Sequence, residues 1–158
     1  MGIDNYNINQ KGICDMANKT VYFISSNHER SLIAEGWASR LNAKNITFRS
    51  AGWESARVNS FSIEAMKEIC IDLSTIKPHH LNIEELENAD MIILIQDFDK
   101  DERIYLSPTI AKKILNWNII NPEKRSSNPS ETWLLFQEIC DDIALRIRDL
   151  GKSFSSPL

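Results

Sequence analysis

The run of apolar residues at positions 91–95, MIILI, constrains the fold of this chain more than any other feature. A short run that is apolar at every position is typical of a strand buried on both faces, as in a parallel sheet. Three further short apolar runs, at 21–24, 46–48 and 114–117, predict three more strands. All four contain residues that favour extended backbone.

Apolar residues at helical spacing lie between and after these runs. They predict helices over 30–41, from an N-cap at Asn59 or Ser60 onward, and over 130–150. Strands that alternate with helices predict an α/β fold, a three-layer sandwich in which helices flank a four-stranded parallel sheet. The predicted apolar faces consist of Ile33, Trp37 and Leu41, then Ile63, Met66 and Ile69, then Trp133, Phe136, Cys140, Ile143, Ile147 and Leu150.

Length and composition indicate one ordinary globular domain. The chain has 158 residues, 42% of them hydrophobic and 25% charged. We predict a flexible N-terminal arm over 1–18, a single domain over 19–150 and a C-terminal tail over 151–158. No internal repeat divides the domain further.

Charge and cysteine content exclude several classes of function. A net charge of −4 argues against nucleic-acid binding, and no apolar run approaches the ~18 residues of a membrane span. The first residues lack the basic and apolar regions of a signal peptide. Three widely spaced cysteines, Cys14, Cys70 and Cys140, favour neither a disulfide framework nor a zinc site. We therefore predict a cytoplasmic protein, with Cys70 and Cys140 as small buried apolar residues.

The loop after the first predicted strand is the first candidate for a binding site. In open α/β sheets, ligands bind at the carboxyl ends of the strands. The candidate ligand-binding residues are therefore those that lead from this strand into the first helix: Ser25, Ser26, Asn27, His28, Glu29, Arg30 and Ser31.

The segment over 21–41, VYFISSNHERSLIAEGWASRL, resembles the opening of the low-molecular-weight protein tyrosine phosphatase superfamily, most closely its thioredoxin-coupled arsenate reductase branch. The resemblance continues in order through RSAG at 49–52, the segments 65–72 and 88–94, Asn121-Pro122 and the closing helix, and covers roughly 19–150. It implies the family fold and a Cys-x5-Arg loop. In that loop a thiolate attacks phosphorus or arsenic while backbone amides and the arginine hold the oxyanion.

The sequence departs from the family pattern at each reactive position. Ser25 stands where the resemblance implies the cysteine, and Ser25 to Arg30 is Ser-x4-Arg, one residue short. Asn121 stands before Pro122, where the resemblance implies an aspartate general acid. The redox cysteines of the reductase branch are absent after the third strand, which ends Leu94-Ile95-Gln96-Asp97. No catalytic residue is expected; Ser25, Arg30 and Asn121 are degenerate family positions.

Two side chains of the loop leave alternatives open. Glu29 either pairs with Arg30 and fills the anion site, or points to solvent. Either way we expect oxyanion binding to be weak or absent. His28 either acts as a base for Ser25 or has a structural role, and the structural role is favoured.

Two other segments have ordinary interpretations. The acidic stretch 97–102 predicts a solvated loop rather than a calcium site, because it lacks the glycine of a calcium-binding loop. The adjacent His79 and His80 predict an exposed loop without a metal. Trp53 is expected to pack at the rim of the site or to contact a partner.

The sequence thus predicts a pseudophosphatase with no cofactor and no metal, which acts by binding a protein partner or a small ligand. The alternative is a divergent low-molecular-weight phosphatase or arsenate reductase with an altered anion-binding loop. A third possibility is a regulatory antagonist that competes with an active relative for its partners.

Overall fold

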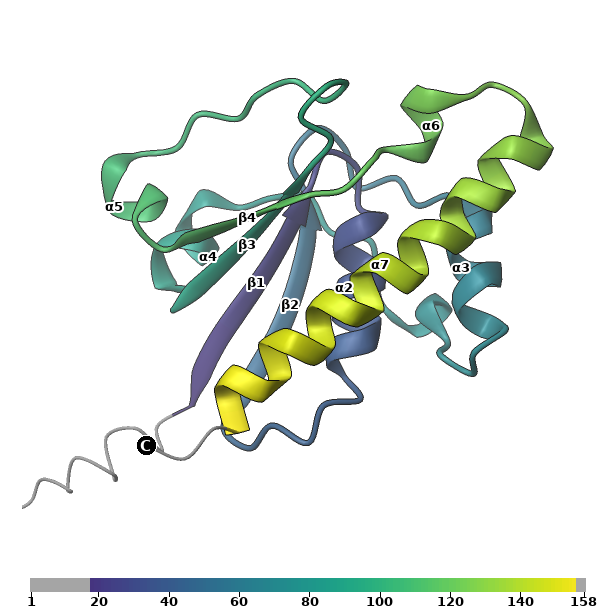
Figure 1. Ribbon diagram of the computed structural model, residues 1–158. Coiled ribbons are helices and arrows are strands. Elements are labelled where there is room, and N and C mark those ends of the chain that lie inside the picture. Colours follow the sequence, from purple (N-terminus) through teal and green to yellow (C-terminus); the bar gives the residue numbers. More distant parts are fainter. Residues whose placement is uncertain (1–17, 156–158) are drawn as a thin grey trace, which may run out of the picture.

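The computed structural model describes residues 18–155. Its centre is a four-stranded sheet in the order β2-β1-β3-β4, with every neighbouring pair parallel (Figure 1). The predicted four-stranded parallel sheet is therefore confirmed. The strands are β1 (Lys19–Ser25), β2 (Ile46–Gly52), β3 (Met91–Gln96) and β4 (Ile114–Asn118).

Helices cover both faces of the sheet. α2, α3 and α7 lie on one face, and α4 and α5 lie on the other (Figure 1). The bounds are α2 (Arg30–Ala38), α3 (Ser60–Lys67), the 3-10 helix η1 (Leu73–Thr75), α4 (Ile83–Asn88), α5 (Pro108–Ala111), α6 (Pro122–Arg125) and α7 (Pro129–Ser155). The three predicted helices correspond to α2, α3 and α7, and the Asn59 side chain caps α3 by accepting from the Phe61 N–H.

Two hydrophobic clusters follow from the alternation of side chains along the strands. Phe23 and Ile93 lie in the cluster beneath α2 and α7, whereas Ile24 and Ile92 lie in the cluster beneath α4 and α5. Successive residues of a strand point to opposite faces. A strand covered on both faces must therefore be apolar throughout, as the run at 91–95 is.

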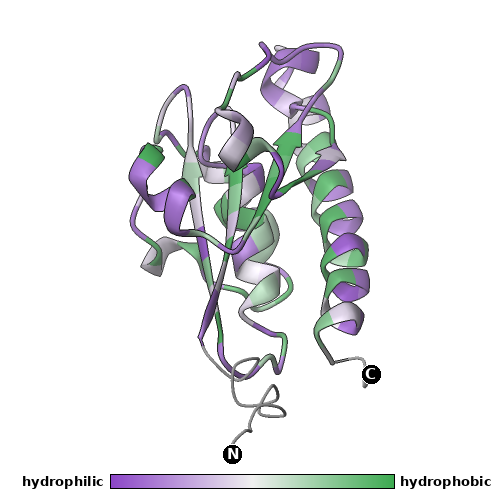
Figure 2. Cartoon of the chain, turned by 90° about the vertical axis from the view of Figure 1, so that its left-hand side faces the viewer, coloured by the Kyte–Doolittle hydropathy of each residue, from purple (hydrophilic) through white to green (hydrophobic). Residues whose placement is uncertain are grey.

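The closing helix is longer than the sequence pattern predicted. α7 continues to Ser155, so the tail expected from Gly151 is helical through Ser155. Its apolar stripe, visible along the helix in Figure 2, faces the core through Phe136, Cys140 and Ile143 among others. The predicted N-terminal arm lies outside the described residues except for Asn18.

The end of α3 also differs from the prediction. Ile69 is 37% exposed and Cys70 is exposed, so the prediction of a buried Cys70 is wrong. Cys70 has a φ of 66°, a left-handed backbone that glycine adopts more easily. This turn carries Cys70 away from the core, whereas Cys140 is buried as predicted, and burial raises the pKa of its thiol to about 12.

None of the helices within residues 18–155 combines the length and the apolarity needed to cross a bilayer.

Gly52 lies where β2 meets the loop that follows β1. Its N–H donates to the His79 carbonyl at 3.0 Å, and its carbonyl accepts from the Leu81 N–H at 2.8 Å. A Cβ at this position would overlap the Ser55 carbonyl oxygen and lie 2.9 Å from backbone atoms of Asn27 and His28. Only glycine allows the end of β2 to approach the loop after β1 this closely.

We predict that Gly52→Ala lowers the free energy of unfolding by about 3 kcal/mol or more, because the overlapping atoms are backbone and cannot rotate away. Gly36→Ala is the matched control, since its added Cβ meets the ends of the Leu73, Ile71 and Met66 side chains. Urea denaturation measures both. Equal losses for the two variants would contradict the assigned role of Gly52.

Candidate anion-binding loop

The loop between β1 and α2 is closed to solvent. Each residue from Ser25 to Ser31 is at most 6% exposed. The Ser25 hydroxyl donates to the Asn27 carbonyl at 2.5 Å, accepts from the Ser31 N–H at 3.0 Å and lies 2.8 Å from the Ser31 hydroxyl. These bonds hold the shape of the loop and leave the hydroxyl without a base.

His28 faces away from Ser25. Its Nδ1 accepts from the His79 N–H at 3.0 Å, so the neutral ring carries its proton on Nε2, which lies 2.6 Å from the Ser50 hydroxyl. Ser50 in turn donates to Glu35. Burial, with a smaller contribution from His79, lowers the pKa of His28 to about 4. His28 is therefore a neutral structural residue, as favoured by the sequence, and forms no catalytic pair with Ser25.

Arg30 is fully buried and already bound to an anion from its own chain. Its guanidinium forms an ion pair with Asp101 at 2.8 Å, and both side chains are 0% exposed. It also donates to the Ile119 carbonyl and the Ser26 hydroxyl, each at 2.9 Å. The prediction that Glu29 pairs with Arg30 is wrong: the carboxylate at Arg30 comes from the segment after β3.

Asp101 is held by several donors besides Arg30. Asn121 Nδ2 donates to it at 2.9 Å, and the Lys124 ammonium lies 3.3 Å away. Burial alone would raise the pKa of Asp101, but the charge of Arg30 and the hydrogen bonds from the Asp97 N–H, Asn121 and Arg30 lower it below its usual value. Asp101 is therefore ionised at neutral pH and pairs with Arg30, whose Nε lacks a hydrogen-bond partner among the described residues.

The acidic stretch after β3 is only partly solvated, contrary to the prediction. Asp97 is 1% exposed and accepts two hydrogen bonds from Arg125, at 2.6 and 2.7 Å. Although burial opposes ionisation, Arg125 and the N–H groups of Asn121 and Asp99 lower the pKa of Asp97 to about 2. The side chain of Asp99, in contrast, is 82% exposed.

Glu29 neither pairs with Arg30 nor points to solvent. It is 1% exposed, and no donor among the described residues reaches either carboxyl oxygen with ordinary hydrogen-bond geometry. Burial, followed by the negative charge of Glu123, raises the pKa of Glu29 to about 7. The backbone N–H of Asn59 and the positive charges of Arg57 and Arg30 act in the opposite direction. Both sequence alternatives for this side chain are wrong.

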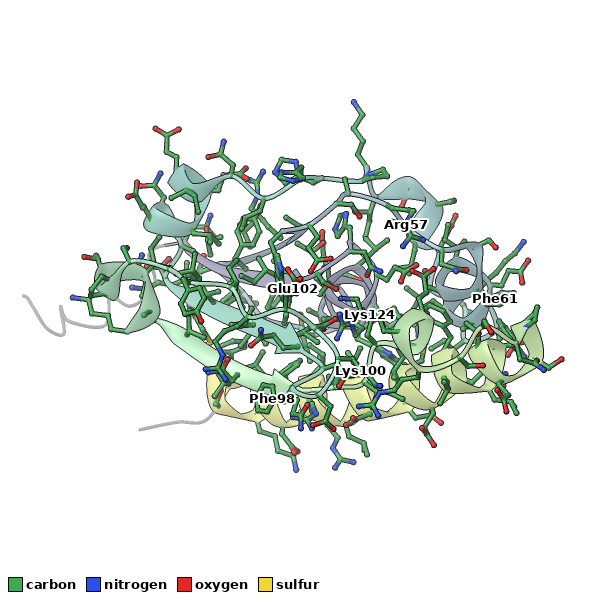
Figure 3. The ribbon with its side chains drawn as sticks, turned by 90° about the horizontal axis from the view of Figure 1, so that it is seen from above. Arg57, Phe61, Phe98, Lys100, Glu102 and Lys124 are labelled. Atoms are coloured by element: carbon green, nitrogen blue, oxygen red, sulfur yellow. The ribbon has the colours of Figure 1, made fainter. Side chains whose placement is uncertain are left out.

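The structure brings Asn121 to the loop from a distant part of the chain. Its amide nitrogen donates to the Ser26 hydroxyl at 3.2 Å as well as to Asp101, and the residue is 1% exposed. The position expected for a general acid therefore lies beside the loop, but it carries an amide. Lys124 and Arg57 border this end of the sheet, which Figure 3 shows from above.

The remaining candidates lie around the same edge. Trp53 packs against the apolar cluster on the α4 side, and its backbone N–H donates to the Ser25 carbonyl at 2.9 Å. The His79 side chain is 43% exposed and lies 2.7 Å from Glu85. Residues 18–155 contain no cluster of three or more His, Cys, Asp or Glu side chains suited to a metal ion.

A parallel sheet in this order, with a buried arginine loop at its carboxyl edge, defines a phosphatase-like α/β protein. The family model "Low molecular weight phosphotyrosine protein phosphatase" matches residues 20–156. The chain belongs to this family, which confirms the resemblance seen in the sequence.

Similar proteins point to the arsenate reductase branch. The arsenate reductase of Bacillus subtilis (strain 168) is 30% identical over 87% of this chain and 99% of its own length. Arsenate reductase 1 of Staphylococcus haemolyticus is 33% identical over 87% and 98%. A solved arsenate reductase in the phosphate-binding state superposes with a TM-score of 0.69 at 26% identity, covering 87% of this chain and 99% of that one.

We predict that Asp101→Asn lowers the free energy of unfolding by about 3–5 kcal/mol, because it leaves the buried Arg30 charge without its partner. Asp99→Asn, two residues away and exposed, should change it by less than about 0.5 kcal/mol. Chemical denaturation at neutral pH measures both. Similar small effects of the two variants would show that the Arg30–Asp101 pair does not support the loop.

Proposed function

We propose that this protein is a catalytically inactive member of the low-molecular-weight phosphatase family that acts by binding a protein partner or a small ligand. The observation that carries the proposal is the buried ion pair between Arg30 and Asp101. An arginine that stabilises an oxyanion must be available to it. Here the guanidinium is already paired with a carboxylate of the same chain, at 2.8 Å.

The nucleophile supports the same proposal. Ser25 offers a hydroxyl, which is a weak nucleophile unless a base removes its proton. The nearest candidate base, His28, uses its lone pair at Nδ1 to accept from the His79 N–H. A thiol would ionise far more readily in such a loop. Ser25 is therefore a structural residue of the loop.

The leaving-group side of the site lacks an acid. Asn121 occupies the position beside Pro122, and its amide already donates to Ser26 and Asp101. An amide cannot give a proton to a leaving oxygen and recover it in the next step. Glu123, the nearest carboxylate in sequence, is held by Arg57 and Asn59.

A binding role accounts for the intact core beneath an altered loop. Phe98 is 58% exposed on the segment after β3, and the Arg57 side chain is 60% exposed on the segment after β2. Both lie toward the carboxyl end of the sheet in Figure 3. Aromatic and arginine side chains are common at the centres of protein interfaces. The three cysteines, none in a disulfide pattern, favour the reducing cytoplasm as the place of action.

The alternative function is that of a divergent phosphatase or arsenate reductase. It is favoured by the similarity to arsenate reductases over nearly their whole length. The two functions differ in one measurable property, which is turnover by the purified chain.

We predict no turnover of a chromogenic aryl phosphate and no thioredoxin-coupled reduction of arsenate, with an active family member assayed in parallel. Ser25→Cys alone should not restore either activity, because Asp101 still occupies Arg30 and Asn121 still lacks a proton to give. Turnover by the wild type that is lost in Arg30→Ala would establish the enzyme alternative.

We also predict that phosphate does not raise the melting temperature of the wild type, compared with chloride at equal ionic strength. Asp101→Asn should acquire this response because it releases Arg30 for an external anion. At a phosphate concentration about a hundredfold above the dissociation constant, the gain is about 2.7 kcal/mol, or several degrees. Arg30→Ala/Asp101→Asn is the control without a response. Phosphate stabilisation of the wild type would contradict an occupied site.

A further inference from the structure

Four carboxyl groups meet around the loop, and only one of them lacks a cation. Asp101 pairs with Arg30, Asp97 with Arg125 and Glu123 with Arg57. Glu29 is the fourth. It stands at the N-cap position of α2, yet its side chain makes no capping hydrogen bond there.

Glu123 lies on α6 and accepts four hydrogen bonds. It accepts from Arg57 at 2.6 and 2.9 Å, from Asn59 Nδ2 at 2.6 Å and from Asn27 Nδ2 at 3.2 Å. Burial would raise the pKa of Glu123, but the hydrogen bonds from Arg57 and Asn59 bring it below the usual value. Its contacts tie the loop after β1 and the segment after β2 to α6.

The Glu29 side chain reaches this carboxylate from the loop and forms a hydrogen bond with it that helps to lower the pKa of Glu123. The charged groups around it are Glu123 from α6, Arg57 from the segment after β2 and Arg30 from the start of α2. Arg30 is already neutralised by Asp101, and Arg57 by Glu123. An ionised Glu29 would therefore be a buried negative charge without a partner, next to a second one.

We propose that Glu29 and Glu123 hold one proton between them and that this proton latches α6 over the anion-binding loop. With the proton on Glu29, the pair carries a single negative charge, which the donors from Arg57, Asn59 and Asn27 satisfy. When Glu29 releases the proton to water, two carboxylates face each other and their repulsion acts on α6. This proposal holds whether or not the anion-binding loop catalyses a reaction.

α6 is well placed to cover the loop. The residues at and next to it contact the site through Asn121 to Ser26, Lys124 to Asp101 and Arg125 to Asp97. Loosening α6 would therefore expose the buried ion pair of Arg30. Protonation of Glu29 would thus regulate the access of an external anion to Arg30.

The direction in which pH changes the free energy of unfolding follows from the pKa of Glu29 in the folded and in the unfolded chain. The pKa of Glu29 is about 7 in the folded chain and about 4.5 when unfolded. Its contribution to stability is complete below the unfolded value and is lost as pH rises through the folded value. His28 acts oppositely, since its folded pKa of about 4 makes the protein less stable as pH falls below about 6.5. A comparison of variants separates the two groups.

The test compares urea unfolding of the wild type and Glu29→Gln between about pH 5.5 and pH 8. The unfolding equilibrium constant of the wild type should rise by roughly tenfold or more relative to that of Glu29→Gln over this interval. His28 and the other carboxyl groups contribute equally to both proteins. Glu102→Gln, an exposed residue on the segment after β3, is the matched control and should behave as the wild type. Parallel pH profiles of wild type and Glu29→Gln would overturn the proposal.

A local measurement tests the latch itself. Amide hydrogen exchange of the segment 119–126, relative to that of α7 in the same sample, should increase with pH in the wild type but not in Glu29→Gln. Because both segments experience the same chemical exchange conditions, their ratio reports opening of α6. An unchanged ratio in the wild type would overturn the role of α6.

Infrared spectroscopy keeps the test decisive if Glu29→Gln does not fold. The wild type should show the carbonyl band of a protonated carboxylic acid at about pH 6, and this band should disappear through about pH 7. Burial also raises the pKa of Glu35, so Glu35→Gln serves as the second variant. Persistence of the band in Glu35→Gln supports Glu29 as its source, and its loss there would overturn the assignment.

Discussion

The buried ion pair between Arg30 and Asp101 determines how this end of the molecule is arranged. Two charges withdrawn from water are tolerated only when hydrogen bonds satisfy their remaining donors and acceptors. The Ile119 carbonyl and the Ser26 hydroxyl accept from Arg30, while Asn121 and Lys124 bind Asp101. Ser26 lies in the loop after β1, whereas Ile119, Asn121 and Lys124 all lie in the segment after β4. The pair thereby ties the loop after β1 to the segments that follow β3 and β4.

The fold was predictable because its signals are local. A strand covered on both faces must be apolar at every position, and the run at 91–95 shows this within five letters. The continuation of α7 beyond Gly151 was not predicted, because a glycine after an apolar stripe is also a common helix end. The position of Cys70 was missed for a related reason: its left-handed φ of 66° is set by the turn after α3, which apolar spacing does not reveal.

The candidate site was only half predictable. The residues of the loop and Asn121 were found because they occupy a contiguous turn or a position that the family pattern marks. The sequence did not identify Asp101 as the partner of Arg30. The segment after β3 is irregular, so no repeating pattern of residues predicts which of its side chains returns to the loop. Because Glu29 directly precedes Arg30, the sequence favoured Glu29 as its partner. Consecutive residues at the start of a helix, however, point in different directions. Glu29 faces Glu123 while Arg30 faces Asp101.

The positive charge of an arginine in this loop can be balanced by a carboxylate of the chain or by an external anion. A helix N-terminus and an arginine attract negative charge whatever its source. An arsenate reductase with the same fold has been solved in a phosphate-binding state, in which the anion comes from outside the chain. Here a carboxylate of the chain itself lies against the arginine, and its attachment to the backbone removes the entropy loss of binding a free anion. An external anion would have to displace this tethered carboxylate, which is the physical basis for expecting a weak response to phosphate.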